Sequence, residues 1–388
     1  MPTVIAGPLE STSVLAANQM PDEDRMLYLL KPYQSQFFQK LYFSNRKSKE
    51  VIDSTGKFSY FEDVLYPHQD LLNATGIVGG ASSEDAIGLT NPSYFAQDDI
   101  LLVEETEELV YVDSVAGGNV DITSMDGGLI TAAASTYVKK IGTRVLEINT
   151  PRVAQSTQEV HVSNYLTIFS ESVEMSSREQ AAKHFTNGRT YDEQIEKKAL
   201  EMKQMFERNF MFSTESGRDT SGTYATTWGK GFLGLVTTNR VGYTTVTETA
   251  LDTFLQGVYD TGGSNERDFY LGSTLSIQIN QLIKNYYNIT GIPAREYGVD
   301  LMKYLLPFGM TNIYWNPRMD GGFKTKGFAV DWEYITMRYM APDKKGSQKF
   351  RIEEDVEVNG SSSGKAKLYA DIGIEIPNEI VHGIFEKS

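Results

Sequence analysis

The stretch from Thr190 to Phe212 constrains the fold more than any other part of the chain. Apolar side chains recur along it at spacings of four, four, three, four and four residues, which draws one continuous stripe on a helix. At its start, Thr190 and Glu193 have the spacing of a capping box, in which each side chain accepts a hydrogen bond from the other residue's backbone N–H. The sequence therefore predicts one helix about 35 Å long, a support for the fold rather than the wall of a pocket. The residues of the stripe are Tyr191, Ile195, Ala199, Met202, Phe206 and Phe210.

The charged residues of this stretch are expected on the other faces of the helix. Glu193 precedes Lys197, and Lys203 precedes Glu207, at a spacing of four residues. Side chains at this spacing are neighbours on a helix surface, and each such pair contributes roughly 0.2–0.5 kcal/mol. Glu207 is thus expected to lie away from the apolar stripe.

Composition indicates a globular protein with more than one structural unit. A chain of 388 residues is long for one core and suggests roughly two or three units. Its 40% hydrophobic and 22% charged residues argue against a disordered protein. The absence of Cys removes disulfides, thiolate nucleophiles and thiolate metal sites, and fits assembly in a reducing cytoplasm. No signal-peptide pattern and no run of about 18 apolar residues is present, so no contact with a membrane is expected.

The net charge of −15 opposes a general role in nucleic-acid binding, because affinity for phosphates comes mainly from clustered Lys and Arg. A container is a different case, since a shell confines DNA mechanically. We interpret the charge as that of an acidic wall along which a packaged polymer slides without sticking.

The pattern of the chain changes along its length. Residues 1–57 contain only short helix-compatible pieces and little to bury, which is typical of an extended arm. Residues 95–150 are β-rich, with short runs separated by AGGN and MDGG turns, and predict a small antiparallel barrel or curled sheet. Between residues 231 and 320, two amphipathic helices alternate with short strands, which predicts helices laid on a sheet. The strands after Val330 are expected to close the domain that contains the long helix.

Three sequence patterns could indicate a chemical site, but each has a simpler structural explanation. Gly229, Gly231 and Gly234 spell GxGxxG, but the context favours a turn that feeds a strand over a dinucleotide site. The histidines share no metal-ligand spacing, and the acidic cluster lacks a calcium-loop pattern, so a solvated strand face is favoured. We therefore expect no catalytic residue, no cofactor and no metal site. The histidines are His68, His161, His184 and His382, and the acidic cluster is Asp98, Asp99, Glu104, Glu105, Glu107 and Glu108.

The succession of segments around the long helix carries a resemblance. The runs SNYLTIF and SESVEMS precede the helix, a glycine-leucine turn from Gly231 to Val236 follows it, and ADIGIEIPNEIVHGIF closes the chain. In this order the chain resembles the major capsid proteins of tailed double-stranded DNA bacteriophages, which have the Hong Kong 97-like fold. It is similar to the branch in which a β-rich insert precedes the helix, called the spine helix. That insert opens with Phe95, Asp98, Asp99, Ile100 and Leu101, then EELVYVDSV from Glu107 to Val115.

The resemblance implies an α+β capsid fold and a structural protein, not an enzyme. Copies of the chain are expected to assemble into hexamers and pentamers of an icosahedral or prolate head shell, which encloses double-stranded DNA without sequence-specific binding. Expected partners are neighbouring capsid subunits and portal, scaffolding and decoration proteins. The expected location is the virion, after assembly in the cytoplasm of the bacterial host. The implied parts are an N-terminal arm (1–57), an extended loop (58–94), a β-barrel-like insert (95–150), a peripheral domain (151–230) with the spine helix (190–212), an axial α/β domain (231–325) and closing strands of the peripheral domain (326–388).

Two alternatives stay open at this point. The first is a cytoplasmic nanocompartment shell of the same fold, which the β-rich insert disfavours. The second is a soluble enzyme or carbohydrate-binding protein that uses the β-rich region as a module. Shells, tubes or rings seen by electron microscopy distinguish the capsid from a ligand-responsive monomer.

Overall fold

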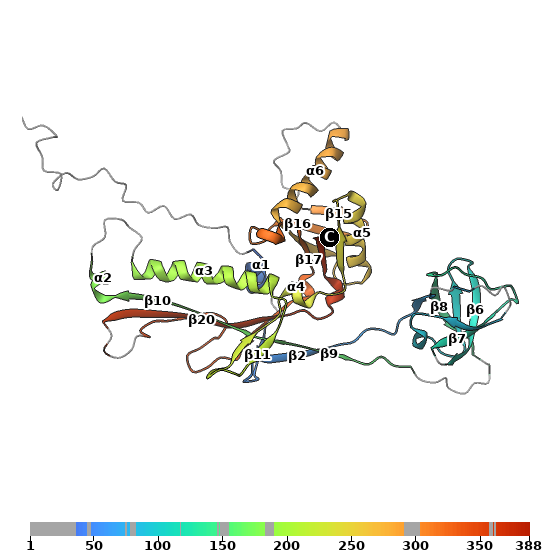
Figure 1. The fold of residues 1–388 in the computed structure, drawn as a ribbon, viewed down its shortest axis with the longest axis horizontal. Helices are drawn as coiled ribbons and strands as arrows, with labels where there is room; N and C mark the ends of the chain where they lie inside the picture. Colours follow the sequence, from blue (N-terminus) through green and yellow to red (C-terminus); the bar gives the residue numbers. More distant parts are fainter. Residues whose placement is uncertain are drawn as a thin grey trace, which may run out of the picture. The chain divides into compact units, whose positions relative to one another are not determined.

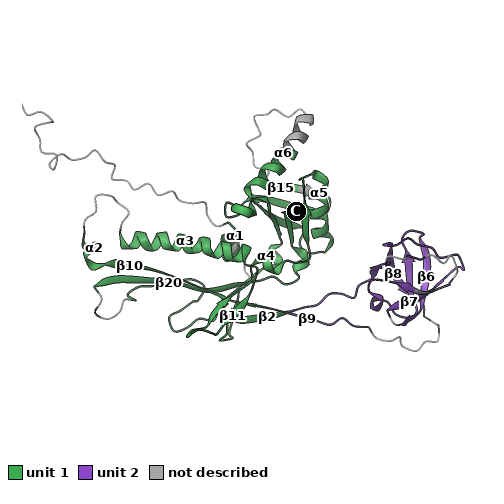
Figure 2. Cartoon of the chain, viewed as in Figure 1, with its two compact units in different colours: residues 1–60, 162–388 green, residues 61–161 purple. Residues whose placement is uncertain are grey.

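The computed structural model describes residues 36–44, 48–73, 76–77, 83–116, 118–145, 147, 155–182, 190–290, 303–356, 360 and 362–388. The chain folds into two compact units (Figure 2). The main unit comprises Met1–Tyr60 and Val162–Ser388, and the insert unit comprises Phe61–His161. Each unit has its own hydrophobic core.

Two long antiparallel strands dominate a five-stranded sheet in the main unit. β10 and β20 pair from Thr167 opposite Ile372 to Ser176 opposite Ser363. Over the first part of β20, fully buried residues alternate with half-buried ones, as in a sheet that is covered on one face. The strand order is β1 Ser48–Val51, β18 Thr336–Met340, β20 Ser363–Glu375 and β10 Thr167–Ser176, with β19 Arg351–Glu353 also paired to β20.

The covered face carries α3, Tyr191–Phe212, which lies along β10 and β20 (Figure 1). A capping box begins the helix. The Glu193 N–H donates to Thr190 Oγ1 at 3.4 Å, and the Thr190 N–H donates to Glu193 Oε2 at 3.1 Å. Both bonds satisfy backbone N–H groups that the helix leaves without a partner.

The apolar stripe of α3 is what fastens the helix to the sheet. The Phe206 ring lies 4.8 Å from the Phe169 ring of β10, centroid to centroid, in an edge-to-face arrangement. Replacing a buried phenylalanine such as Phe206 by alanine costs about 3–5 kcal/mol. Among the stripe residues Met202, Phe206 and Phe210 are fully buried, Ile195 is buried, and Tyr191 and Ala199 are half-buried against the same core.

A six-stranded sheet forms the second layer of the main unit. On β14, Phe269 and Leu271 pack against helices α5 and α6, whereas Tyr270 between them belongs to the core beneath α3. The sheet is therefore covered on both faces, which explains why almost all of β14 is buried. The order is β13 Arg240–Tyr243, β21 Gly383–Lys387, β17 Gly327–Val330, β14 Glu266–Leu271, β16 Gly309–Trp315 and β15 Lys303–Leu306, and the helices are α5 Glu248–Asp260 and α6 Ser273–Thr290.

Helices on a sheet were expected in this region, but two of its strands come from further along the chain. β17 and β21 lie within 326–388, the range expected only to close the domain of the long helix. The sequence FAVDWEYITMRYM is split between the two sheets of the main unit. At the break, Asp331 accepts the N–H of Ser264 at 2.7 Å and that of Glu333 at 3.0 Å, and a 3₁₀ turn, Trp332–Tyr334, separates β17 from β18.

The insert unit is a six-stranded sheet around its own core. Its edge strands β3 and β4 meet, because the Asn73 N–H donates to Gly88 O at 2.9 Å and the Thr90 N–H to Leu71 O at 3.0 Å. The sheet thus closes on itself in the manner of a small barrel. The order is β3 Gln69–Leu71, β8 Tyr137–Thr143, β5 Asp99–Val103, β6 Glu108–Ala116, β7 Asn119–Ser124 and β4 Ser83–Gly88.

The insert is larger than the range 95–150 expected from the sequence. β3 and β4 precede Phe95, and the neighbouring residues Leu72, Ile77 and Leu89 fill the core with the central strands. β3 has only three residues, too few to show the alternation by which strands are recognised.

Short elements connect these layers. A two-stranded ribbon of β2 Lys57–Glu62 and β9 Val160–Tyr165 joins the units along the chain, and β11 Gly217–Asp219 pairs with β12 Thr226–Trp228 as a hairpin. The other helices in the described residues are α1 Gln36–Gln39, a π-helical turn Lys40–Ser44, α2 Ser177–Ala181, α4 Phe232–Leu235 and the 3₁₀ turns Pro92–Tyr94, Gly321–Thr325 and Glu379–Val381.

We predict that Thr190→Ala lowers the stability of dissociated subunits by about 1 kcal/mol, because the first turn of α3 loses its cap. Urea unfolding followed by circular dichroism measures the change. Thr190→Ser is the control, since it keeps the hydroxyl and should stay close to wild type. Equal losses in the two variants would show that the methyl group, rather than the cap, matters.

Candidate functional site

The N-terminal segment 36–44 is inserted into the core of the main unit. Phe37 is fully buried, and its ring lies 5.6 Å from the Tyr270 ring and 5.2 Å from the Trp332 ring. Phe38 lies 5.1 Å from Phe206 and 6.1 Å from Phe210, both on α3. This segment therefore joins the long helix to the six-stranded sheet.

A buried carboxylate holds the same segment from the sheet side. Lys40 forms an ion pair with Asp268, which is almost fully buried on β14. The Trp332 Nε1–H donates to Asp268 Oδ2 at 2.7 Å, and the Asn312 side-chain amide donates to Asp268 Oδ1 at 3.2 Å. The Tyr270 hydroxyl also donates to Asp268 Oδ2, at 3.4 Å. One cation and three neutral donors thus compensate a charge that would be costly to bury alone.

Glu207 of α3 lies in this region and not on an outer face of the helix, so its expected position was wrong. Its carboxylate is fully buried and accepts hydrogen bonds from Asn316 Nδ2 at 2.6 Å and from the Phe38 N–H at 3.5 Å. Burial raises the pKa of Glu207, and these hydrogen bonds act in the opposite direction. Helical spacing alone could not show this, because the partners come from distant segments.

These contacts also differ from the structure predicted for residues 1–57. That range was expected to be an extended arm with little to bury. Residues 36–44 instead contribute Phe37, Phe38 and Leu41 to the main core, and β1 pairs in parallel with β18. Residues 1–35 lie outside the described part of the chain.

The GxGxxG glycines allow close packing of backbone segments. A Cβ atom at Gly229 would lie 2.1 Å from Tyr165 O, and one at Gly231 would lie 2.3 Å from Asn209 O at the end of α3. A Cβ at Gly234 would approach Thr214 O to 2.7 Å. The turn leads into the short helix α4 rather than directly into a strand, and its glycines are explained by packing without a bound phosphate.

The described histidines do not come together. His382 is fully buried, its Nδ1 accepts the Asp331 N–H at 3.1 Å, and burial lowers its pKa to about 3, so the imidazole is neutral. His161 lies beside Phe61 on the β2–β9 ribbon, with 5.1 Å between ring centroids. Within the described residues, no group of histidines and carboxylates is arranged to hold a metal ion. His184 lies outside the described residues.

The acidic cluster of the insert unit is also dispersed. Asp99 is buried and pairs with Lys140 at 2.8 Å. Asp98 pairs with Arg144 at 3.3 Å, and Glu104 pairs with Lys139. Glu105 accepts the Ala133 N–H at 2.5 Å.

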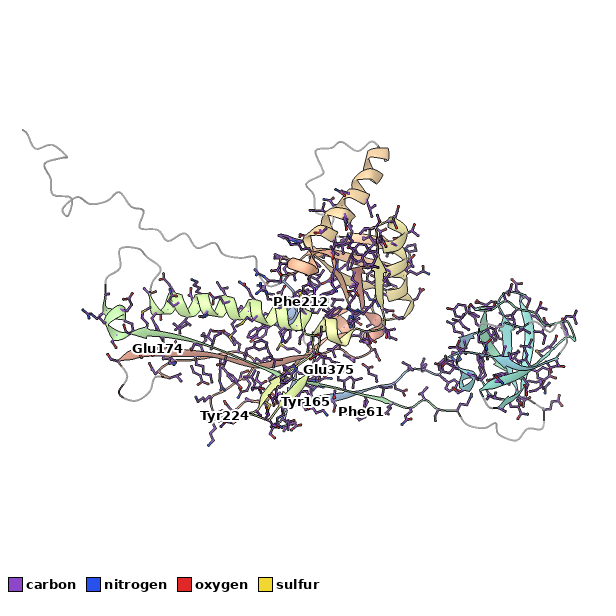
Figure 3. All side chains as sticks on the ribbon, viewed as in Figure 1. Phe61, Tyr165, Glu174, Phe212, Tyr224 and Glu375 are labelled. Atoms are coloured by element: carbon purple, nitrogen blue, oxygen red, sulfur yellow. The ribbon has the colours of Figure 1, made fainter. Side chains whose placement is uncertain are left out.

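Several large apolar side chains are exposed to solvent, and a catalytic site would not account for them. Tyr224, in the β11–β12 hairpin, is 85% exposed, and Phe61 on β2 is 67% exposed (Figure 3). Leu65, just after β2, is 92% exposed. Its neighbour Val64 and Val160, which begins the paired strand β9, are more than half exposed. Groups of exposed apolar residues mark surfaces that contact other molecules.

Comparison with known proteins decides between the functions that the sequence left open. The sequence matches the family described as SU10 major capsid protein over residues 10–388, nearly the whole chain. The chain belongs to this family. It is therefore a phage major capsid protein with an α+β, Hong Kong 97-like fold, and it forms the shell of a phage head as part of the virion.

Similarity to solved structures is broad and distant. A Mycobacterium phage Bobi structure has 8% identity and a TM-score of 0.46, and the match covers 98% of this chain and 99% of that one. Mycobacterium phage Patience gives 13% identity and 0.42, covering 63% and 75%. An encapsulin complex from Synechococcus elongatus gives 12% and 0.41, covering 59% and 77%. No curated protein sequence matches. At these TM-scores the likenesses carry no argument, and the family match alone identifies the protein.

For this capsid protein the functional site is the set of surfaces that meet other subunits, and its role is structural rather than enzymatic. Recognition of the capsid family from the sequence is confirmed. No helix in the described part of the chain is long and apolar enough to cross a membrane.

Sequence reasoning missed the two carboxylates that the capsid protein buries beneath α3, Glu207 and Asp268, and the segment 36–44 that contacts them. The paired phenylalanines Phe37 and Phe38 were the available signal, since adjacent large aromatics are seldom left in solvent.

Asp371, on β20, is a buried carboxylate whose charge is not compensated by a cation within the described part of the chain. Asp371 is 7% exposed, its Oδ1 has no hydrogen-bond partner among the described residues, and burial raises its pKa to about 6. A raised pKa means that the folded state prefers the protonated acid. The favourable contribution is therefore complete at low pH and is lost as the pH rises through about 6.

We predict that Asp371→Asn stabilises the capsid subunit at pH 7 by up to about 3 kcal/mol, and that this gain shrinks toward zero as the pH falls to about 4. Urea unfolding of dissociated subunits across this range measures it. Glu174→Gln is the matched control, because hydrogen bonds from Lys365 and Ser363 lower the pKa of Glu174 and reverse the sign of its pH dependence. A constant difference between Asp371→Asn and wild type would contradict the assignment.

Proposed function

We propose that this capsid protein assembles as hexamers and pentamers into the icosahedral or prolate head of a tailed phage, around double-stranded DNA. The exposed apolar group near the β2–β9 ribbon supports the proposal most directly. Leu65 is 92% exposed and Phe61 is 67% exposed. Contacts between repeated subunits of a shell can bury this apolar surface. The partner in these contacts is a neighbouring copy of the chain.

Each part of the subunit is proposed to correspond to one domain of a capsid protein. The five-stranded sheet with α3 would be the peripheral domain, and the six-stranded sheet with α5 and α6 would be the axial domain around which copies gather. The chain at 58–68 and 155–165 would be the extended loop, with the insert unit between its two strands. This division differs from the residue ranges expected from sequence in four respects. It assigns β17 and β21 to the axial sheet, β3 and β4 to the insert, residues 155–165 to the extended loop, and residues 36–44 with β1 to the peripheral domain instead of the arm.

The shell is proposed to need no reacting residue, cofactor or metal. Each contact between subunits can be weak, because the same contact is repeated over the whole shell. DNA would be enclosed mechanically, and portal, scaffolding and decoration proteins would be the other partners. A cargo-holding compartment of the same fold would copurify with an enzyme, which a capsid would not.

The double variant Phe61→Asp, Leu65→Asp tests the subunit contact. Burying a leucine contributes about 1.5–3 kcal/mol, and a buried unpaired carboxylate is strongly unfavourable. We expect soluble, folded subunits but no shells when the expressed protein is viewed by electron microscopy.

The control is Phe61→Leu, Leu65→Met, which keeps the apolar surface and should form shells. Circular dichroism establishes that both proteins are folded. Normal shells from the aspartate variant would exclude these residues as a subunit contact.

A further inference from the structure

The negative charge of the chain is concentrated in the insert unit. Residues 61–161 contain 16 Asp and Glu but only four Lys and Arg, a net charge of −12 out of −15 for the whole chain. The main unit accordingly carries only −3. The acidic charge from which an acidic wall for DNA was inferred therefore belongs mainly to the insert unit.

Each of the three cations described in the insert unit pairs with one carboxylate, and these pairs are already included in the net charge of −12. Lys140 pairs with the buried Asp99, while Arg144 pairs with Asp98 and its guanidinium lies 3.7 Å from the centroid of the Tyr111 ring. Lys139 pairs with Glu104. Asp126 is bonded to neutral donors, Ser124 Oγ at 2.7 Å and the Gly128 N–H at 2.9 Å, and these do not cancel its charge.

A row of apolar side chains crosses the outer face of the same sheet. Strand register places Leu102 of β5 opposite Leu109 of β6, and Ile100 opposite Tyr111. The buried residues Leu101, Val103, Val110 and Val112 alternate with them, so the row faces away from the core. On β8 the register places Lys139 opposite Leu102 and Gly142 opposite Ile100, and Ile141, which is 56% exposed, lies in the bulge between them. On the other side Met125, which is 47% exposed, donates its N–H to Leu109 O at 3.0 Å. We call these residues, Ile100, Leu102, Leu109, Tyr111, Met125 and Ile141, the outer row.

Carboxylates bracket the outer row at both ends of its strands. Glu104 and Glu107 lie in the turn between β5 and β6, and Asp126 follows Met125. At the opposite end, the Asp98 N–H donates to Val112 O at 2.8 Å, which places Asp98 beside Asp113. Glu104 and Asp98 are paired with Lys139 and Arg144, so the negative charge of the rim comes from Glu107, Asp113 and Asp126. An apolar centre with a polar, charged rim is the usual arrangement of a protein-binding face.

We propose that the outer row is a docking surface for a different protein whose contact region is apolar at its centre and rich in Lys or Arg at its edge. A second insert unit is disfavoured as the occupant, because two units that each carry a net charge of −12 repel each other. The main unit of a neighbouring copy, at −3, offers little electrostatic attraction. A basic auxiliary protein of the head fits both the charge and the apolar centre. The inference uses the shell-forming role of the chain but not the proposed contact through Leu65.

The test uses shells of the full chain and a fluorescent peptide with a Leu-Val-Leu centre and lysines at both ends. A second peptide replaces the centre by Ser-Thr-Ser, and a third replaces the lysines by glutamates. Fluorescence anisotropy at low and at physiological salt gives the affinities. We expect the first peptide to bind about tenfold more tightly than the second and the third not to bind.

Two sets of variants locate the binding. Leu102→Ser with Leu109→Ser should abolish the preference for the apolar centre, and Glu107→Gln with Asp113→Asn and Asp126→Asn should weaken both lysine peptides and reduce the salt dependence. Ile168→Ser is the control, because Ile168 is an exposed apolar residue of the main unit, at 46%. It should bind all peptides as wild type does.

Three results would overturn the proposal. Equal affinity for the apolar and the Ser-Thr-Ser peptides would leave only nonspecific charge attraction. Loss of shells in the Leu102→Ser, Leu109→Ser variant, with folded subunits, would make the outer row an interface between copies. Binding to dissociated subunits but not to shells would mean that a neighbouring copy covers it. Electron microscopy of each preparation separates these results from a failure of the Leu65 contact.

Discussion

Packing of one aromatic cluster between α3 and two sheets is the interaction on which the main unit depends. Phe206 and Phe210 reach down from the helix to β10 and to the segment that carries Phe38. Phe232 of α4 continues the contact to Phe328 of β17, 5.3 Å between ring centroids. A helix that lies along a sheet needs such contacts over its length, because helix propensity alone does not hold it there.

The same cluster explains why carboxylates are buried beneath the helix. Glu207 and Asp268 each meet donors from segments that are far apart in sequence, including the Phe38 N–H and Lys40. Buried polar groups of this kind contribute less to stability than to a unique arrangement, because any other packing leaves a donor or a charge unsatisfied. For a subunit copied many times in one shell, a single well-defined shape matters, since errors in shape are repeated at every contact.

The two units differ in net charge as clearly as they differ in fold. The main unit is almost neutral, so contacts between its copies are free of strong long-range repulsion, while the insert unit concentrates the acidic residues of the chain. Net charge alone suggested one acidic surface. Only the division into units shows that the charge belongs mainly to the small closed sheet, where it surrounds an apolar face.

The sequence by itself determined the elements whose signals are local and the family to which the chain belongs. The capping box at Thr190, the stripe from Tyr191 to Phe210 and the buried face of α5 all follow from spacing within one helix. Tertiary structure alone decided which strands share a sheet and which charges are buried. β21 joins β17 although more than fifty residues of chain, including β18 and β20, lie between them, and Glu207 turns inward because Asn316 and the Phe38 N–H are there to receive it. Pairings over such separations depend on the closure of the whole core, and no periodicity in a single segment encodes them.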